Sequence, residues 1–326
     1  MAPPFFIVGN DRSGTTMLRM ILDRGPDAAI PPESMFLTDV ALPQDGAWQP
    51  LMDAVWRHPK VRLWRLPGPP PRVPPELDAA EAARFVLAAP FETYARMHGK
   101  PRWGDKTPHY VHHVEELLAL WPDARVVVLV RDGRDVALSL RRMPFGPNNA
   151  WAAAQWWARG IRAGRAAEAR HPEQVRTFRY EDLATDPARH VPEVCAFLAL
   201  RYRPDMLALE QADRSRIVPD QASWFPTLFE GINTLAVGRW RREMPARDQA
   251  VFAALAGDEL AALGYPVPTR AVWPPSPRRD ALYRRHNELM RNVNFVRLRV
   301  FQERGRELGP AVRRRLRDPV RRGTTA

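Results

Sequence analysis

The N-terminal segment from Phe5 to Asp23 constrains the fold of this chain more than any other feature. Phe5 to Val8 form an apolar run that is typical of a buried strand, and Gly9 to Thr16 read GNDRSGTT, with the Gly-x-x-x-x-Gly spacing of a phosphate-binding loop. Thr15 to Asp23 then carry apolar side chains at helical spacing. A strand, a glycine loop and a helix in this order aim backbone N–H groups and the positive helix end at an anion.

A second strand and helix are expected near the middle of the chain. Arg125 to Val130 hold four valines and a leucine, which predicts a central parallel strand covered on both sides. A helix should follow from Asp132 to about Arg142, and a weaker strand is expected at Val175 to Tyr180. Because alternating strands and helices form parallel sheets, we expect an α/β, P-loop-like three-layer fold. Its central, mostly parallel sheet would be flanked by helices, with an α-rich periphery and a basic C-terminal helix.

The sequence between the expected strands predicts further helices and one surface loop. The loop is the proline-rich stretch 67–75. The helical candidates span 47–57, 76–98, 109–121, 151–169, 191–200 and 247–263.

The positive charge of the chain is concentrated at its C-terminal end. The net charge is +12, but residues 271–326 hold fifteen arginines and five acidic residues, which leaves +2 for residues 1–270. Because the net charge of residues 1–270 is close to zero, we expect no nucleic-acid partner. We therefore divide the chain into one domain at 1–270 and a basic C-terminal helical extension with a mobile tail at 271–326.

Within this extension, one helical stripe is apolar and the arginines lie elsewhere. The stripe would dock on the body, while a homodimer contact and peripheral contact with an acidic surface are the alternatives. The arginine-dense end beyond Arg313 is expected to be mobile. The stripe consists of Leu282, His286, Leu289, Val293, Val296 and Val300.

The apolar segments of the chain are short. None approaches the roughly 20 residues that a membrane span needs, and Met1 to Val8 have no basic region ahead of an apolar run. We therefore expect a cytoplasmic protein.

Thr15 is the most informative residue of the glycine loop. ATP- or GTP-hydrolysing loops carry lysine at this position, where it reaches the outer phosphates while the next hydroxyl holds magnesium. The absence of this lysine argues against cleavage of a nucleoside triphosphate. The basic residue is instead Arg12, before the second glycine, which suits a donor with one 5′ phosphate and a group beyond it.

Four segments, taken together, resemble a known family. They are RSGTT after the strand FIVG, RVVVLVRDGRDVALSL at 125–140, GDKTP at 104–108 and RYEDLATDP at 179–187. In this combination the chain resembles sulfotransferases that use 3′-phosphoadenosine 5′-phosphosulfate (PAPS), above all the bacterial and Golgi-type, tyrosylprotein- and carbohydrate-sulfotransferase-like members. The resemblance runs across roughly residues 5 to 241.

The resemblance implies which residues bind PAPS. Arg131 and Ser139 would hold the 3′ phosphate, and their spacing lets an arginine at a strand end and a hydroxyl two helical turns later reach one anion. Tyr180 would lie beside the adenine, and Arg239 would close over the nucleotide. The 5′ phosphosulfate would be surrounded by Arg12, Ser13, Gly14, Thr15 and Thr16.

The resemblance also implies the catalytic residues. Arg12 and Lys106 would contact the sulfuryl group or the bridging oxygen, and Glu33 would be the base that takes the proton of the acceptor hydroxyl. His109 is the rival base, because cytosolic sulfotransferases use a histidine near the equivalent lysine. Although His109 and His113 have a spacing that could bind zinc, no third ligand is evident, and we expect no metal requirement.

The expected function is transfer of a sulfuryl group from PAPS to the hydroxyl of a carbohydrate, glycolipid or secondary metabolite, by in-line displacement. Two alternatives stay open. One is a nucleotide kinase-like P-loop phosphotransferase, and the other is a non-catalytic protein that binds an adenosine nucleotide.

Overall fold

The computed structural model describes residues 2–141, 143, 145–216, 228–267 and 276–307, with side chains as far as 294 in the last helix. The fold is built on a five-stranded sheet of order β2-β3-β1-β4-β5, in which all neighbouring strands are parallel. The strands are β1 (Phe5–Gly9), β2 (Ala28–Ala29), β3 (Arg102–Lys106), β4 (Arg125–Val130) and β5 (Val175–Arg179).

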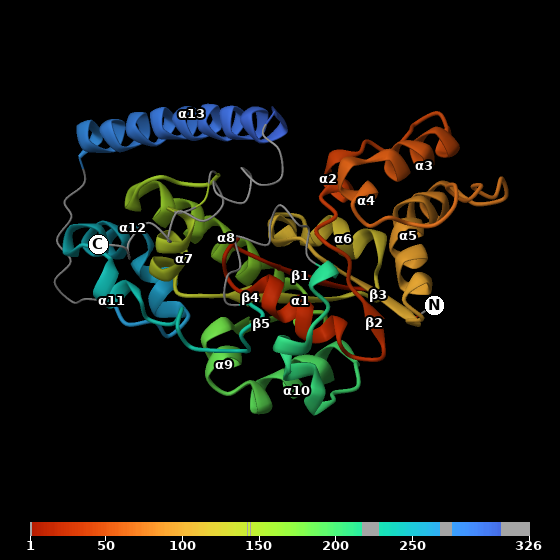
Figure 1. Cartoon of the computed structure of the whole chain (residues 1–326), viewed down its shortest axis with the longest axis horizontal. Coiled ribbons are helices and arrows are strands. Elements are labelled where there is room, and N and C mark those ends of the chain that lie inside the picture. The colour runs from red at the N-terminus through yellow and green to blue at the C-terminus, as the bar shows by residue number, and fades with distance from the viewer. Residues whose placement is uncertain (1, 142, 144, 217–227, 268–275, 308–326) are drawn as a thin grey trace.

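Helices cover both faces of this sheet (Figure 1). Alternate side chains of β1 point to opposite faces, so Phe6 and Val8 join one core while Phe5 and Ile7 join the other. The first core is covered by α3 (Trp48–Arg57), α5 (Ala79–Met97), α6 (Val114–Leu120), α7 (Gly133–Leu140), α8 (Ala150–Arg170) and α12 (Ala246–Ala262). The second is covered by α1 (Thr15–Asp23), α9 (Tyr180–Thr185) and α10 (Pro187–Leu198).

The expected α/β fold with three layers and a parallel sheet is confirmed. The first strand, the helix after the glycine loop and the valine-rich strand lie where the sequence predicts them. The remaining short elements are α2 (Phe36–Asp39), α4 (Pro59–Arg62), α11 (Trp240–Glu243) and the 3₁₀ helices η1 (Pro108–His112), η2 (Pro204–Leu207), η3 (Leu209–Gln211) and η4 (Arg214–Arg216).

The structure differs from the sequence prediction at two strands and one helix. Strand β3 carries the sequence RWGDK, which has no apolar pattern, yet all five residues are buried beside β1. Strand β2 has only two residues. The helix expected at 109–121 is instead two elements, η1 and α6, separated at His113.

The basic C-terminal helix exists as α13 (Pro277–Glu307), and it docks on the start of α8 through polar contacts. The Trp151 indole donates to Asp280 over 2.9 Å, the Asn149 amide donates to the Tyr283 carbonyl over 2.9 Å, and the Asn148 backbone N–H donates to Asn287 over 2.8 Å.

The two leucines of the expected stripe do not face the body, whereas His286 of the same stripe lies with its Nδ1 3.2 Å from the Asn149 side-chain amide. Leu282 is 67% exposed and Leu289 is 62% exposed. The boundary expected at 270 and the tail beyond Arg313 fall outside the described residues, so the division into two regions stays a prediction. Within the described part of the chain, none of the helices has the length and apolar character to cross a bilayer.

The carboxyl ends of the strands lie along one edge of the sheet, which is where open α/β folds bind ligands. The glycine loop follows β1, Lys106 ends β3, Arg131 follows β4 and Tyr180 follows β5. The topology therefore brings these sequence-distant residues to one edge.

Candidate functional site

The glycine loop between β1 and α1 is shaped by two glycines that no other residue could replace without strain. Gly9 has a φ of 147°, and an added Cβ would lie 2.3 Å from the Leu129 carbonyl oxygen of β4. Gly14 has a φ of 91°, and a Cβ there would lie 2.2 Å from the ring of Tyr180. The loop is thus pressed between β4 and Tyr180.

The loop ends at a helix N-terminus that is open to an anion. Gly14 caps α1 without a side-chain hydrogen bond, and the first turn of α1 holds no acidic residue, so its backbone N–H groups point outward uncapped. The buried Ser13 hydroxyl has no hydrogen-bond partner among the described residues. Both features fit a phosphate or sulfate oxygen at this position.

Arg12, Arg131 and Ser139 converge on one side of the loop. The Arg12 Nε donates to the Ser139 hydroxyl over 3.0 Å, and Arg131 Nη1 donates to the Arg12 carbonyl over 3.1 Å. Arg131 is buried, its guanidinium lies 4.8 Å from the centre of the Tyr180 ring, and its Nε has no partner in the described part of the chain. These residues therefore form a buried cationic cluster at the loop.

The electrostatics of this cluster also favour an anion. Burial and, next to it, the positive charge of Arg131 lower the pKa of Arg12, against the opposing effect of Asp11 and Glu33. A bound anion would stabilise the charge of the half-buried Arg12 guanidinium against these two effects.

Lys106 and Glu33 meet on the other side of the loop. The Lys106 ammonium lies 2.6 Å from Oε1 of Glu33 and donates to the Thr16 hydroxyl over 3.3 Å. The Lys106 side chain is 4% exposed and that of Glu33 26% exposed. Lys106 is therefore a buried residue of β3.

The ion pair sets the charge state of Glu33. Burial alone would raise the pKa of this carboxyl, but the charge and hydrogen bond of Lys106, with weaker effects of Lys60 and Arg19, bring the pKa below its usual value. Glu33 is therefore a carboxylate at neutral pH, as a general base requires. The ion pair uses Oε1 and leaves Oε2 outside it.

A buried hydroxyl network holds the loop that carries Glu33. The backbone N–H of Ser34 donates to the Thr107 hydroxyl over 3.1 Å, and the Ser34 hydroxyl lies 2.9 Å from the Tyr110 hydroxyl. The same tyrosine oxygen accepts the backbone N–H of Leu37 over 3.0 Å. Glu33 is thus fixed to β3 and η1 by its neighbours, and it does not cap α2, whose N-cap is Met35 without a side-chain hydrogen bond.

Two carboxyl groups near this pair escaped sequence reasoning. Asp105 is fully buried beside Lys106, and its Oδ2 has no partner among the described residues; burial raises its pKa to about 7. Burial, followed by the charge of Glu33, raises the pKa of Asp11 to about 6. Each of these aspartates directly precedes a predicted site residue, Asp11 before Arg12 and Asp105 before Lys106, and this adjacency could have identified them from the sequence.

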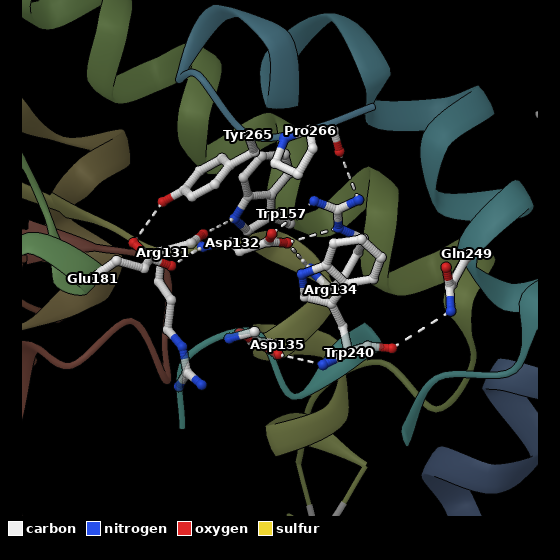
Figure 2. A network of polar contacts seen from close by, with 11 residues as sticks. Arg131, Asp132, Arg134, Asp135, Trp157, Glu181, Trp240, Gln249, Tyr265 and Pro266 are labelled. Carbon is white, nitrogen blue, oxygen red and sulfur yellow. Dashed lines mark hydrogen bonds and ion pairs between the residues drawn. The ribbon is translucent and has the colours of Figure 1, made fainter. Parts of the chain in front are cut away.

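Tyr180 is held against the glycine loop by its neighbour Glu181. One carboxylate oxygen of Glu181 accepts the Asp132 backbone N–H over 2.9 Å, and the other accepts the Tyr265 hydroxyl over 2.8 Å. Figure 2 shows Glu181 between these two groups, with Arg131 pointing away from the neighbouring Asp132 and Arg134 side chains. The start of α9 is thereby tied to the end of β4.

Asp135 fastens the segment 236–240 beside the cationic cluster. Its two carboxylate oxygens accept the backbone N–H groups of Gly238 over 2.7 Å and Trp240 over 2.8 Å, and Arg131 donates to the Ala236 carbonyl. Asp135 is fully buried, so it does not belong to a surface ion pair.

Two residues expected at the site have other contacts in the structure. Arg239, which follows Gly238, donates to Glu243 through Nε over 2.8 Å and through Nη2. His109 is exposed, and its ring lies 5.6 Å from that of His112 and 5.5 Å from that of His113. The roles of Arg239 over the nucleotide and of His109 as rival base stay predictions.

The described part of the chain holds no group of three or more His, Cys, Asp or Glu side chains arranged to bind a metal ion. The arrangement as a whole pairs an uncapped helix end and a cationic cluster with a lysine–glutamate pair across one loop. It is suited to bind a multiply charged anion on one side and to move a proton on the other.

Comparisons with known proteins identify the family and the fold that the chain resembles. The model of a family described as "Sulfotransferase family" matches residues 3–204. A putative protein-tyrosine sulfotransferase of Caenorhabditis briggsae is 27% identical over 243 residues, which cover 72% of this chain and 79% of the relative. The nodulation protein NoeE of Sinorhizobium fredii is 25% identical over 290 residues, which cover 80% of this chain and 65% of that protein.

Solved structures show the same fold. The sulfotransferase domain of the Synechococcus PCC 7002 olefin synthase is similar with a TM-score of 0.58 and 23% identity, over 81% of this chain and 96% of the domain. The sulfotransferase domain of the curacin biosynthetic pathway has a TM-score of 0.53 and 21% identity, over 82% of this chain and 98% of the domain.

Proposed function

The chain belongs to the sulfotransferase family, and from this premise we propose that it transfers a sulfuryl group from PAPS to an acceptor hydroxyl. The observation that carries the proposal is the pairing of Lys106 with Glu33 at 2.6 Å, across the glycine loop from the Arg12, Arg131 and Ser139 cluster. One side can bind the anionic donor while the other activates the acceptor.

The residues present fit the charges of PAPS. The Ser13 hydroxyl, which has no partner within the described part of the chain, and the start of α1, which has no side-chain cap, suit the 5′ phosphosulfate. Arg131, whose Nε is equally unpartnered among the described residues, and Ser139 suit the 3′ phosphate. The Tyr180 ring, against Gly14, would contact the adenosine. PAPS would supply the sulfuryl group together with a leaving group, the 5′ phosphate of the nucleotide.

In this mechanism, Glu33 accepts the proton of the acceptor hydroxyl at Oε2. As the new oxygen–sulfur bond forms, the bond from sulfur to the 5′-phosphate oxygen breaks, and the Lys106 ammonium and the Arg12 guanidinium stabilise the negative charge on the transferred group and the leaving oxygen. The products are the sulfated acceptor, 3′-phosphoadenosine 5′-phosphate (PAP) and a proton held by Glu33.

For the acceptor, we propose a carbohydrate, glycolipid or secondary metabolite. The test is transfer of radiolabelled sulfate from PAPS to a panel that contains sugars, a glycolipid, phenols and a tyrosine peptide, the last because relatives carry the name protein-tyrosine sulfotransferase. Labelled product from at least one hydroxyl acceptor, without added magnesium, is expected. Labelling of the same panel from γ-labelled ATP instead would favour the kinase-like alternative and overturn the proposal.

A further inference from the structure

The outer face of α13 takes no part in the proposed site. This helix of 31 residues lies along the margin of the molecule (Figure 1). Its inner side contacts residues 148–151 at the start of α8 through Asp280, Tyr283, His286, Asn287 and Asn294.

Helix geometry places Leu282 and Leu289 away from most of these contacts. At about 100° per residue, Leu282 and Leu289 fall on nearly the same line along the helix, while Tyr283, Asn287 and Asn294 lie about a third of a turn away. The two leucines are accordingly 67% and 62% exposed. The sequence continues this line with valines at 293, 296 and 300.

Arginines accompany the exposed leucines. Arg278 and Arg285 are exposed and fall within about 60° of the leucine line. The whole of α13 holds nine arginines and four acidic residues. Two exposed leucines flanked by arginines, on a helix that docks through another side, fit a helix that lies in a membrane interface.

We propose that α13 attaches the protein to the surface of a bilayer that contains anionic phospholipid. Leu282 and Leu289 would enter the boundary between headgroups and acyl chains, and Arg278 and Arg285 would contact the lipid phosphates. Because α13 packs on α8 with its other side, the helix can bind lipid without leaving the body.

A second copy of the chain fits this face less well. Two such helices that met along their leucine lines would bring the flanking arginines of both copies together, and like charges at these positions destabilise a helix pair. A negatively charged lipid surface neutralises the same arginines. Charge complementarity therefore selects the anionic bilayer as the occupant.

The test is co-sedimentation of the full chain with phosphatidylcholine vesicles that contain or lack phosphatidylglycerol. Binding is expected only to vesicles with phosphatidylglycerol, and it should weaken as salt increases. The double variant Leu282→Ser, Leu289→Ser should bind about tenfold more weakly or worse. The matched control is Leu63→Ser, which alters a leucine that is 47% exposed elsewhere and should bind like the unaltered chain.

Equal vesicle binding by the double variant and the unaltered chain would overturn the proposal, as would no binding to phosphatidylglycerol vesicles at low salt. A dimer in light scattering that the double variant dissociates, without vesicle binding, would assign the face to a second copy instead. The readout does not involve sulfuryl transfer, so its failure is distinct from failure of the proposed function.

Discussion

At the scale of single residues, the site depends on how buried charges are compensated. Glu33 and Lys106 compensate each other at 2.6 Å, and the partnership keeps Glu33 ionised despite its burial. At Arg12, by contrast, burial and the positive charge of Arg131 lower the pKa, and a bound anion would oppose both effects. The chemistry proposed above follows from this contrast.

The variant Glu33→Gln tests the base directly. Because the amide cannot accept the proton of the acceptor, kcat should fall by roughly 100-fold or more, while the affinity for PAP, measured by calorimetry, should stay within a few-fold. His109→Gln is the matched control and should retain its kcat. The reverse result, with Glu33→Gln active and His109→Gln inactive, would show that His109 is the general base and would contradict the proposal.

Asp105 gives a prediction about stability and pH. Burial raises its pKa from 3.8 to about 7, with an added effect of Glu33 against the opposing bonds of Thr107 and Ser34 and the charge of Lys106. The folded chain therefore keeps this proton where the unfolded chain loses it, and stability should decline as pH rises from about 4 to about 7.

The variant Asp105→Asn should remove this dependence. At about 1.4 kcal/mol per pKa unit, ionisation of this carboxyl lowers the free energy of unfolding by up to about 4 kcal/mol at pH 8. The variant should therefore melt higher than the unaltered chain at pH 8, with a smaller difference at pH 5, in thermal unfolding scans. A lower melting temperature at both pH values would show that the carboxyl stabilises the fold.

At the scale of elements, carboxylates that accept backbone N–H groups fix the segment 236–240 to α7 and the start of α9 to the end of β4. Asp135 binds Gly238 and Trp240, and Glu181 binds Asp132 (Figure 2). These bonds orient Arg131 and Tyr180 toward the glycine loop.

The variant Asp135→Ala tests this arrangement. It leaves two backbone N–H groups without their acceptor and loosens the segment whose Ala236 carbonyl binds Arg131. The Kd for PAP should increase about tenfold, while kcat at saturating PAPS should change little. Asp258→Ala, at an exposed aspartate of α12, is the control. A fall in kcat with unchanged Kd would contradict the positioning role.

Sequence reasoning succeeded where a local pattern carries the information. The glycine spacing and the valine-rich strand located β1, α1 and β4 because their apolar periodicity is strong. It missed β3, whose charged residues become buried only through pairing with β1. It could not find the partnership of Asp135 with Gly238 and Trp240, since a contact between residues about a hundred positions apart leaves no local signal.

At the scale of the whole molecule, one parallel sheet explains the site. The strand order brings the residues after β1, β3, β4 and β5 to one edge, and short hydrogen bonds fix their side chains there. The proposed donor side and acceptor side therefore lie along one edge of the sheet, while α13 lies apart on α8.

The most direct test of the account is calorimetric titration of the chain with PAP in buffer without magnesium. The account predicts saturable binding, at least about tenfold weaker in Arg131→Ala because the charged hydrogen bonds to the 3′ phosphate are lost, and weaker binding of ATP with magnesium than of PAP. Tighter binding of magnesium ATP than of PAP, or equal binding of PAP by Arg131→Ala and the unaltered chain, would contradict it.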